Sequence, residues 1–310
     1  MSNFIEIFTK ILVFSYPIIA LVGLIANIFT FVVISGKKYQ NTVYSIYYRF
    51  ITLFCIASMI IPVSKFLEFN YDMVYWTFND GLCKSRMLIF YFLQPILGWG
   101  NVIVSIDRYS SIAFPNRFLF RKKSSFQILV CSLILAFNLI YYSPFLFFYV
   151  KITNNLSNHT NNHTIVQSQR SCTSDFYQKD WFNALNTSFV PFIIMFLFTL
   201  LTLIKIYKSR NLNGNNTITN NNNHNKTKRK DFRFAINSIA TNILFLILNL
   251  PYGIYRIINL YVYETNIKQK LIYSIVYVPY YLSLSSIFFT NLIVNSIFRS
   301  ELKRLLRITK

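Results

Sequence analysis

The chain has 310 residues, of which 54% are hydrophobic and only 13% are charged, and its formal net charge is +21. A soluble domain has about 25% charged residues, so this composition indicates a membrane protein rather than a soluble domain. The positive charge alone would suit a nucleic-acid binder. We exclude that class because the basic residues are confined to loops between apolar segments, as a membrane surface requires.

Seven segments have about 20 or more mostly apolar residues, the length needed to cross a bilayer. Backbone groups inside a bilayer must hydrogen-bond within their own segment, so each is predicted to be a helix. The segments are Ile11–Ile34, Val43–Phe66, Lys84–Tyr109, Phe126–Val150, Phe182–Ile206, Phe232–Ile257 and Leu271–Ile297. The first is too long for a signal peptide and lacks a small-residue cleavage site. The predicted fold class is an all-α membrane protein, one seven-transmembrane helix bundle over residues 1–310.

The distribution of Lys and Arg predicts the orientation. Of the 31 basic residues, 19 fall in Ser35–Thr42, Asn116–Ser125, Lys205–Arg233 and Arg299–Lys310. The alternate segments hold 10 basic residues and seven of the ten acids. Because basic loops stay on the cytoplasmic side, we expect a multi-pass protein of the plasma membrane with an extracellular N-terminus and a cytoplasmic C-terminus.

Sequons support this orientation. Asn155, Asn158 and Asn162 each begin an Asn-X-Ser/Thr motif in a loop expected outside the cell, where glycosylation is possible. Two further sequons, at Asn215 and Asn225, fall in a loop expected inside, where they would be inert.

The loop between the fifth and sixth segments is of low complexity. Residues 211–225 read NLNGNNTITNNNNHN, which is polar and has no core-forming pattern. With the basic run that follows, we predict a disordered third intracellular loop over 211–230. It is either a spacer without a specific role or a flexible loop whose basic end faces a cytosolic partner.

The C-terminal stretch is predicted to be amphipathic. Between Phe298 and Ile308, apolar residues recur at helical spacing and basic residues accompany them. This pattern is typical of a helix over 298–308 that lies on the membrane surface and is attracted to anionic lipid.

The third segment ends with Asp107-Arg108-Tyr109, and Cys83 lies 25 residues before Arg108. In a helix this separation is about 37 Å, so the cysteine and the charged pair would lie at opposite faces of a bilayer. Charged residues within a span are costly and usually functional. Asp107 is positioned to hold Arg108 in a charge-assisted pair; alternatively, the pair only marks the membrane boundary. The arrangement is typical of a signalling receptor.

The four cysteines divide into two pairs. Cys55 and Cys131 lie inside spans and are expected to be small packing residues. Cys83 and Cys172 both fall on the side expected to be oxidising, where a disulfide persists. Two free thiols are the alternative.

These features together resemble the rhodopsin-like G-protein-coupled receptors over nearly the whole chain. The matching motifs are Gly23-Leu-Ile-Ala-Asn27 in the first helix, Asp107-Arg108-Tyr109 with Pro115 beyond, Pro191 and Pro251 in the fifth and sixth helices, and Asn291-Leu-Ile-Val-Asn295 where the family has Asn-Pro-x-x-Tyr. The resemblance implies a disulfide between Cys83 and Cys172 that pins the outer loop across the bundle.

Several departures are similar to the nematode serpentine chemoreceptors of classes V and gamma. Asn249 replaces the sixth-helix Trp, Cys55 replaces a sodium-binding Asp, and Asn295 replaces the seventh-helix Tyr. The residues that a sodium site and a Trp-based activation switch need are therefore replaced in this chain. A chemosensory receptor is the expectation.

The resemblance implies a heterotrimeric G protein as the cytoplasmic partner. In the resting state, the Asp107–Arg108 pair would keep the cytoplasmic mouth closed, and ligand binding would favour a state in which the sixth helix swings out at Pro251. The residues expected to carry coupling are Asp107, Arg108, Tyr109, Pro251 and Asn291. Asn27 and Pro191 are expected to have structural roles, as a cross-helix hydrogen bond and a kink.

A small-molecule ligand is expected in a cavity open to the outside. Phe90 stands where amine receptors carry an Asp, and Ser285 stands at the position of the retinal-bearing Lys, so neither an amine nor retinal is expected. The candidate lining residues are Phe90, Gln94, Tyr252, Tyr255, Arg256, Tyr277 and Tyr281. They suggest an uncharged or weakly anionic ligand with Arg256 as an anion partner. The alternative role for each aromatic residue is packing or the interfacial belt.

An enzyme is disfavoured, because His159, His163 and His224 all lie in polar loops and the spans contain no inward pair of acids or metal cluster. We therefore predict no catalytic residue, metal or cofactor. A transporter is the alternative, although the internal repeats and paired helix breaks typical of that class are not evident. A receptor partner that no longer couples is a third possibility.

Overall fold

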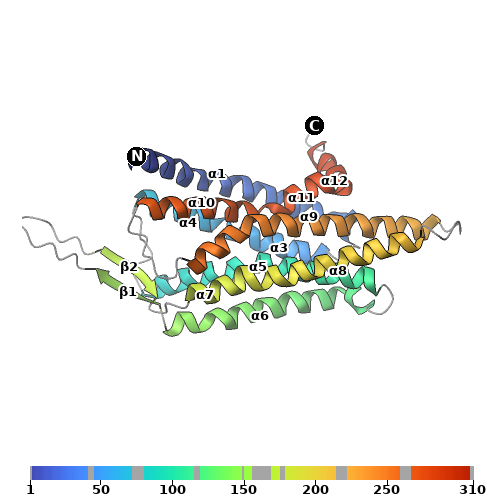
Figure 1. Cartoon of the computed structure of the whole chain (residues 1–310), viewed down its shortest axis with the longest axis horizontal. Helices are drawn as coiled ribbons and strands as arrows, with labels where there is room; N and C mark the ends of the chain where they lie inside the picture. The colour runs from blue at the N-terminus through green and yellow to red at the C-terminus, as the bar shows by residue number, and fades with distance from the viewer. Residues whose placement is uncertain are drawn as a thin grey trace, which may run out of the picture.

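The computed structural model describes residues 2–40, 45–71, 80–114, 119–148, 150–155, 169–174, 179–213, 222–258 and 267–307. The long helices run along one axis, with a β-hairpin and the N-terminus of α1 at one end (Figure 1). We call this end the hairpin end. The opposite half of the bundle carries α12, and we call it the α12 end.

The elements follow the predicted order. They are α1 Ser2–Ser35, α2 Lys37–Gln40, α3 Ser45–Ser58, α4 Ile60–Tyr71, α5 Asp80–Ala113, η2 Leu119–Lys122, α6 Ser124–Phe148, β1 Val150–Asn155, β2 Gln169–Ser174, α7 Lys179–Ala184, η3 Leu185–Phe189, α8 Val190–Asn213, α9 Asn222–Ile258, α10 Ile267–Ser283, α11 Ser286–Val294 and α12 Ser296–Arg307. Within the described residues, six helices are long and apolar enough to cross a membrane, and α10 with α11 makes a seventh span bent by 53°. The helical seven-span fold class is confirmed.

Large apolar side chains cover much of the bundle surface. Ile140 on α6 is 71% exposed and Ile18 on α1 is 63% exposed, whereas Tyr16, Ile51 and Asn27 are fully buried. Isolated exposed apolar side chains are normal, but a surface rich in them requires lipid around it. The lipid-facing surface is therefore apolar, and the polar groups that matter for function are inside.

The fifth span contains a π-helix, η3, between α7 and α8. The Val190 N–H bonds to the Leu185 carbonyl, five residues earlier. Pro191 follows directly and has no N–H to offer to the carbonyl of Thr187, four residues before it. The wider turn accommodates this missing bond, and single π turns of this kind are frequent at functional sites.

The seventh span breaks between α10 and α11. Asn27 on α1 donates from Nδ2 to the Leu284 carbonyl at the break, at 3.1 Å, and to the Gly23 carbonyl of its own helix, at 2.9 Å. The side chain of Asn27 is thus placed to bridge α1 and the bent span.

Two differences from the sequence expectation concern loops. The all-α prediction lacked the antiparallel hairpin in which β1 pairs with β2 in the register Ile152↔Cys172. The strands form because antiparallel neighbours in a loop satisfy each other's backbone groups, which a search for apolar helices does not detect. Of the sequons, Asn155 ends β1, and Asn158 and Asn162 lie outside the described residues.

The second difference is in the Asn-rich loop. There α8 continues to Asn213 and α9 begins at Asn222, while 214–221 lie outside the described residues, so disorder over 211–230 stays a prediction. Once a helix has nucleated in a membrane span, adding further residues costs little, so polar sequence extends it. α12 begins at Ser296, two residues before the predicted start.

Candidate functional site

Asp107 and Arg108 are both buried at the α12 end of α5, with exposed fractions of 6% and 4%. Arg121 on η2 places Nη1 3.7 Å from Asp107 Oδ1 and donates to the Asp107 backbone carbonyl at 2.9 Å. Gln127 Nε2 in turn donates to the Arg121 carbonyl at 2.9 Å. The loop after α5 is therefore fastened to Asp107.

Arg121 is a site residue that the sequence reasoning missed as a partner for Asp107. Adjacent residues on a helix point about 100° apart, so Asp107 and Arg108 leave α5 in different directions and a partner from another element fits Asp107 well. A sequence signal was present, because Arg121 begins a basic run that follows the third span, but a basic run by itself indicates only the cytoplasmic side.

Arg108 lies against the fifth and sixth spans. It lines a small cavity with residues of α5, α8 and α9, namely Ser105, Phe198, Thr199, Thr202, Ser238, Ile239 and Asn242. Next to it, the ring of Tyr109 makes edge contacts with Phe198 and Phe114, at centroid distances of 5.6 and 6.2 Å. Any movement of α8 or α9 therefore changes the surroundings of Arg108.

A set of buried amides and hydroxyls ties the helices together beside Arg108. We call it the amide network; its members are Asn237, Asn242, Asn291, Asn295, Tyr39, Ser105, Thr199, Thr241 and Thr290. Asn242 on α9 donates from Nδ2 to Ser105 Oγ at 2.8 Å and to Thr199 Oγ1 at 2.9 Å. One amide thus joins α9 to both α5 and α8.

The amide network continues to α11. Asn237 Nδ2 donates to Asn291 Oδ1 at 3.1 Å, and the hydroxyls of Thr241 and Thr290 are 2.9 Å apart. Asn291 therefore lies between α9 and the seventh span, where its Oδ1 also accepts from Asn295 Nδ2 at 3.0 Å.

Asn295 connects α11, α12 and α2. Its Oδ1 accepts from the backbone N–H groups of Ile297 and Phe298, at 3.1 and 3.2 Å, so it caps α12. Its Nδ2 also donates to Tyr39 Oη at 3.2 Å. Burial raises the pKa of Tyr39, so the phenol remains protonated and neutral at physiological pH. Asn295, which stands where the Asn-Pro-x-x-Tyr motif has its Tyr, therefore has a structural role.

A second contact fastens α2 to α12. The carboxylate of Glu301, 2% exposed, pairs with Lys38 on α2 and with Arg304 on its own helix. Phe298 and Leu302 of α12 are buried against the bundle, whereas Lys303 and Arg304 are exposed.

The hairpin end contains a separate polar network around Gln94. Gln94 Oε1 accepts from Asn183 Nδ2 on α7 and from Tyr252 Oη on α9, both at 3.1 Å. Asn183 Oδ1 accepts from Tyr142 Oη on α6 at 2.9 Å. Gln94 therefore joins α5, α7 and α9 through side chains alone.

The π-helix places Asn186 in the same network. Its Nδ2 donates to Asn138 Oδ1 and Tyr142 Oη, at 3.0 and 3.1 Å, and its Oδ1 accepts from Trp99 Nε1 at 2.9 Å. The sequence reasoning missed Asn183 and Asn186, because only tertiary packing shows that α7 and the π turn aim these two amides into the bundle.

Tyrosines from three helices pack beside Gln94. We call them the tyrosine cluster: Tyr16, Tyr252, Tyr273, Tyr277, Tyr280 and Tyr281, each at most 4% exposed. Tyr252 makes an edge contact with Tyr277 at 5.0 Å and stacks on Tyr280 at 4.5 Å, and Arg256 lies 5.4 Å above the Tyr252 ring.

The structure brings the predicted ligand residues into one connected region. Tyr252, Tyr277 and Tyr281 belong to the tyrosine cluster, Arg256 lies over the rings of Tyr252 and Tyr277, and Gln94 joins the cluster through Tyr252. The ring of Tyr255 makes an edge contact with the ring of Tyr273. The guanidinium carbon of Arg86 lies 5.2 Å from the centroid of the Phe90 ring.

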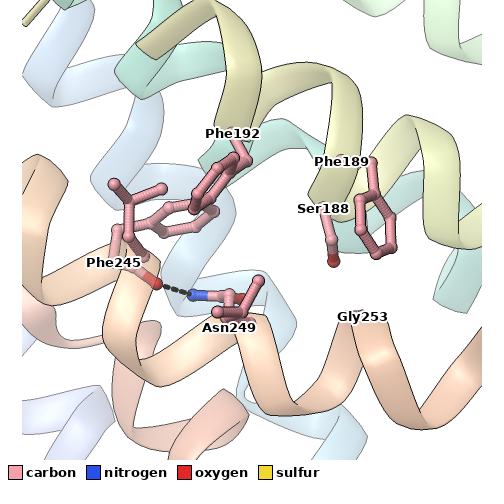
Figure 2. Close-up of a pocket in the computed structure, with 8 residues that line it drawn as sticks. Ser188, Phe189, Phe192, Phe245, Asn249 and Gly253 are labelled. Carbon is pink, nitrogen blue, oxygen red and sulfur yellow. Dashed lines mark hydrogen bonds between the residues drawn. The ribbon is translucent and has the colours of Figure 1, made fainter. Parts of the chain in front are cut away.

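A small pocket lies between η3, α8 and α9, near Pro251 (Figure 2). Phe189 and Phe192 lie on one side and Phe245 and Asn249 on the other, and its volume of about 10 Å³ is room for about one water. Asn249 donates to the Phe245 carbonyl at 2.9 Å. A Cβ at Gly253 would lie 2.9 Å from Ser188 Cβ, so this glycine permits the close approach of α9 to η3.

The cysteines are also placed. Cys55 and Cys131 are buried free thiols, and Cys83, fully buried at the start of α5, is disulfide-bonded. Among the described residues, no group of three or more His, Cys, Asp or Glu is positioned to hold a metal ion.

Seven apolar spans, a buried Asp-Arg pair at one end and a tyrosine-lined polar region at the other define a multi-pass membrane protein of the receptor type. A family model described as "7 transmembrane receptor (rhodopsin family)" matches residues 26–289, which is most of the chain. The chain therefore belongs to the rhodopsin family of seven-transmembrane, G-protein-coupled receptors. No curated protein matches it.

Proposed function

We propose that this protein is a chemosensory G-protein-coupled receptor of the plasma membrane. It detects a small molecule at the hairpin end and activates a heterotrimeric G protein at the α12 end. Membership of the rhodopsin family supports the coupling, and the departures at Asn249 and Asn295, which resemble nematode serpentine receptors, support the chemosensory assignment.

The distribution of charge supports the orientation. Segments at the α12 end hold 19 of the 31 basic residues, so that end faces the cytoplasm. The hairpin end, with the N-terminus, is then extracellular, and Asn155, Asn158 and Asn162 are available for glycosylation.

A disulfide between Cys83 and Cys172 would hold the extracellular hairpin over the bundle. Cys83 is disulfide-bonded while Cys55 and Cys131 are free. Cys172 belongs to β2, and β1, its partner strand, contacts α5. The bond would fix the hairpin as a lid at the ligand end.

The observation that carries the proposed mechanism is the closure of α8 and α9 around Arg108. Asn242 holds α9 against α5 and α8, and Arg121 holds the loop after α5 against Asp107. In the resting state these contacts keep the G-protein surface closed. A ligand that rearranges Tyr252 acts on the same helix, α9, on which Asn242 lies, with Pro251 between them as the bending point.

The proposal is tested by expressing the full chain with a promiscuous Gα and measuring ligand-dependent nucleotide exchange during a screen of small odorants and pheromones. Arg108→Ala should abolish exchange while surface expression is retained. Full signalling by Arg108→Ala would contradict the mechanism, and solute flux without a G protein would favour a transporter.

A further inference from the structure

The segment between α5 and α6 presents a serine directly after three basic residues. It reads Arg121-Lys122-Lys123-Ser124, and no other serine or threonine in the sequence follows three consecutive basic residues. Lys123, Ser124 and Ser125 are exposed. A basic run followed by an accessible hydroxyl is the kind of charge pattern by which serine kinases with an acidic substrate groove select their substrates.

Neither serine occupies the position where serine stabilises a helix end. The N–H groups of Phe126 and Gln127 both bond to the Lys123 carbonyl, at 3.1 and 3.3 Å, so Lys123 is the cap of α6 and Ser124 is its first residue. A capping serine would stand one position earlier and accept bonds from the first turn. The Ser124 hydroxyl is therefore at the surface without a capping role.

The arginine that opens the basic run is hidden. The side chain of Arg121 is 7% exposed, and its Nη1 lies 3.7 Å from Asp107 Oδ1 and 2.9 Å from the Asp107 carbonyl oxygen. Gln127 Nε2 donates to the Arg121 carbonyl, and the ring of Phe120 makes an edge contact with Phe126 at 4.9 Å. We call this arrangement the fastened loop. A protein that approaches from outside cannot contact the Arg121 guanidinium while the loop is fastened.

The same guanidinium thus has two competing uses. A kinase that selects basic residues must pair Arg121 with its own acidic groups, and it must first draw that side chain away from Asp107. In the proposed mechanism the contact between Arg121 and Asp107 belongs to the closed state and is lost when the G-protein surface opens. The open state therefore presents the whole basic run, and the closed state presents only part of it.

We infer that Ser124 is a phosphorylation site that the fastened loop masks. A kinase with an acidic substrate groove would modify receptors that have opened and leave closed ones unmodified. In the reaction, Ser124 Oγ attacks the γ-phosphorus of ATP, the bond from that phosphorus to ADP breaks, and the hydroxyl proton passes to the carboxylate base of the kinase. The inference rests on the proposed function, because it requires the α12 end to face the cytoplasm and Arg121 to leave Asp107 on opening.

The phosphate would also oppose refastening of the loop. A phosphoserine carries a charge of about −1.5 to −2 and three acceptor oxygens, so it competes with the single carboxylate of Asp107 for Arg121. Within the described residues, Arg121 Nε is buried and has no hydrogen-bond partner, and a phosphate oxygen would supply one. The start of α6 favours a negative charge as well. A phosphate on Ser124 would thus mark a receptor that has opened and slow its closure.

The test incubates the full chain in lipid nanodiscs with ATP and the catalytic subunit of cyclic-AMP-dependent protein kinase, and peptide mapping locates and quantifies the phosphate. Phosphate should appear on Ser124, slowly in the wild type. Asp107→Asn should raise the initial rate roughly tenfold, which corresponds to about 1.4 kcal/mol in the fastening equilibrium. If Asp107→Asn does not fold, Gln127→Ala, which loses the bond to the Arg121 carbonyl, should raise the rate severalfold.

Two matched charge removals test recognition in the Asp107→Asn or Gln127→Ala background. Lys123→Gln removes an exposed charge of the basic run and should lower the rate severalfold, whereas Lys303→Gln, exposed on α12, should leave it unchanged. No phosphate on Ser124 in the unfastened variants, equal rates in these variants and the wild type, or an unchanged rate after Lys123→Gln would each overturn the inference. The assay needs neither ligand nor G protein, so its failure is distinct from a failure of coupling.

Discussion

The substitution Asn242→Ala tests the idea that a side-chain amide holds the receptor closed. Asn242 is 3% exposed, and its Nδ2 group donates to Ser105 on α5 and to Thr199 on α8. Both bonds cross between helices, so an outward movement of α9 must break them. Alanine removes the two bonds without adding volume.

The expected magnitude follows from these two bonds. Hydrogen bonds between membrane helices contribute about 0.6 kcal/mol on average and up to about 1.7 kcal/mol each. Losing two would therefore destabilise the resting state by about 1–2 kcal/mol relative to the open state, which raises the open population roughly 5- to 30-fold. Because a ligand shifts the same equilibrium, its apparent affinity should rise as well.

The assay is nucleotide exchange on a purified heterotrimeric G protein, with receptor in nanodiscs and no ligand. A matched control is Asn249→Ala on the same helix, since Asn249 is 4% exposed and, among the described residues, its amide donates to the Phe245 carbonyl of its own helix and to no other helix. Basal exchange should rise in Asn242→Ala and stay within about twofold of wild type in Asn249→Ala, whose lost bond does not cross helices. Wild-type basal exchange in a folded Asn242→Ala receptor, or an equal rise in both variants, would refute the reasoning.

Three further predictions concern stability. Gly100→Ala should lower the unfolding temperature, because the added Cβ would lie 2.4 Å from Ile51 Cγ1, an overpacking that costs about 1–3 kcal/mol. Adding Ile51→Ala to Gly100→Ala should restore much of the lost stability. An unchanged unfolding temperature in Gly100→Ala would contradict the close packing of α5 on α3. Asn295→Ala should loosen α12 by about 1 kcal/mol through loss of its cap, seen as faster amide exchange in α12, whereas unchanged exchange would refute the capping role. Cys83→Ser and Cys172→Ser should each lower the free energy of unfolding by about 2–4 kcal/mol, and the double variant should lose no more than either single variant. Peptide mapping without reductant should find the two cysteines joined. Additive losses or free thiols would contradict the pairing.

The sequence by itself determined the helices and their number. Spans could be predicted because the bilayer imposes a length and an apolar composition that a single segment must meet alone. The amphipathic end helix was predictable for the same reason, since its period is local. Motif spacing also located Asp107, Arg108 and Asn291, and the structure brings these residues to one end of the bundle.

Partners across the bundle could not be predicted in this way. The two bonds of Asn242 and the bonds of the Asn186 amide, which η3 turns inward, join residues far apart in the chain, and the link from Arg121 to Asp107 joins two different elements. Which polar groups meet depends on helix rotation, on the breaks at Met59 and Leu284 and on the missing N–H of Pro191. These features are decided by packing, because a buried donor takes whichever acceptor the neighbouring helix presents.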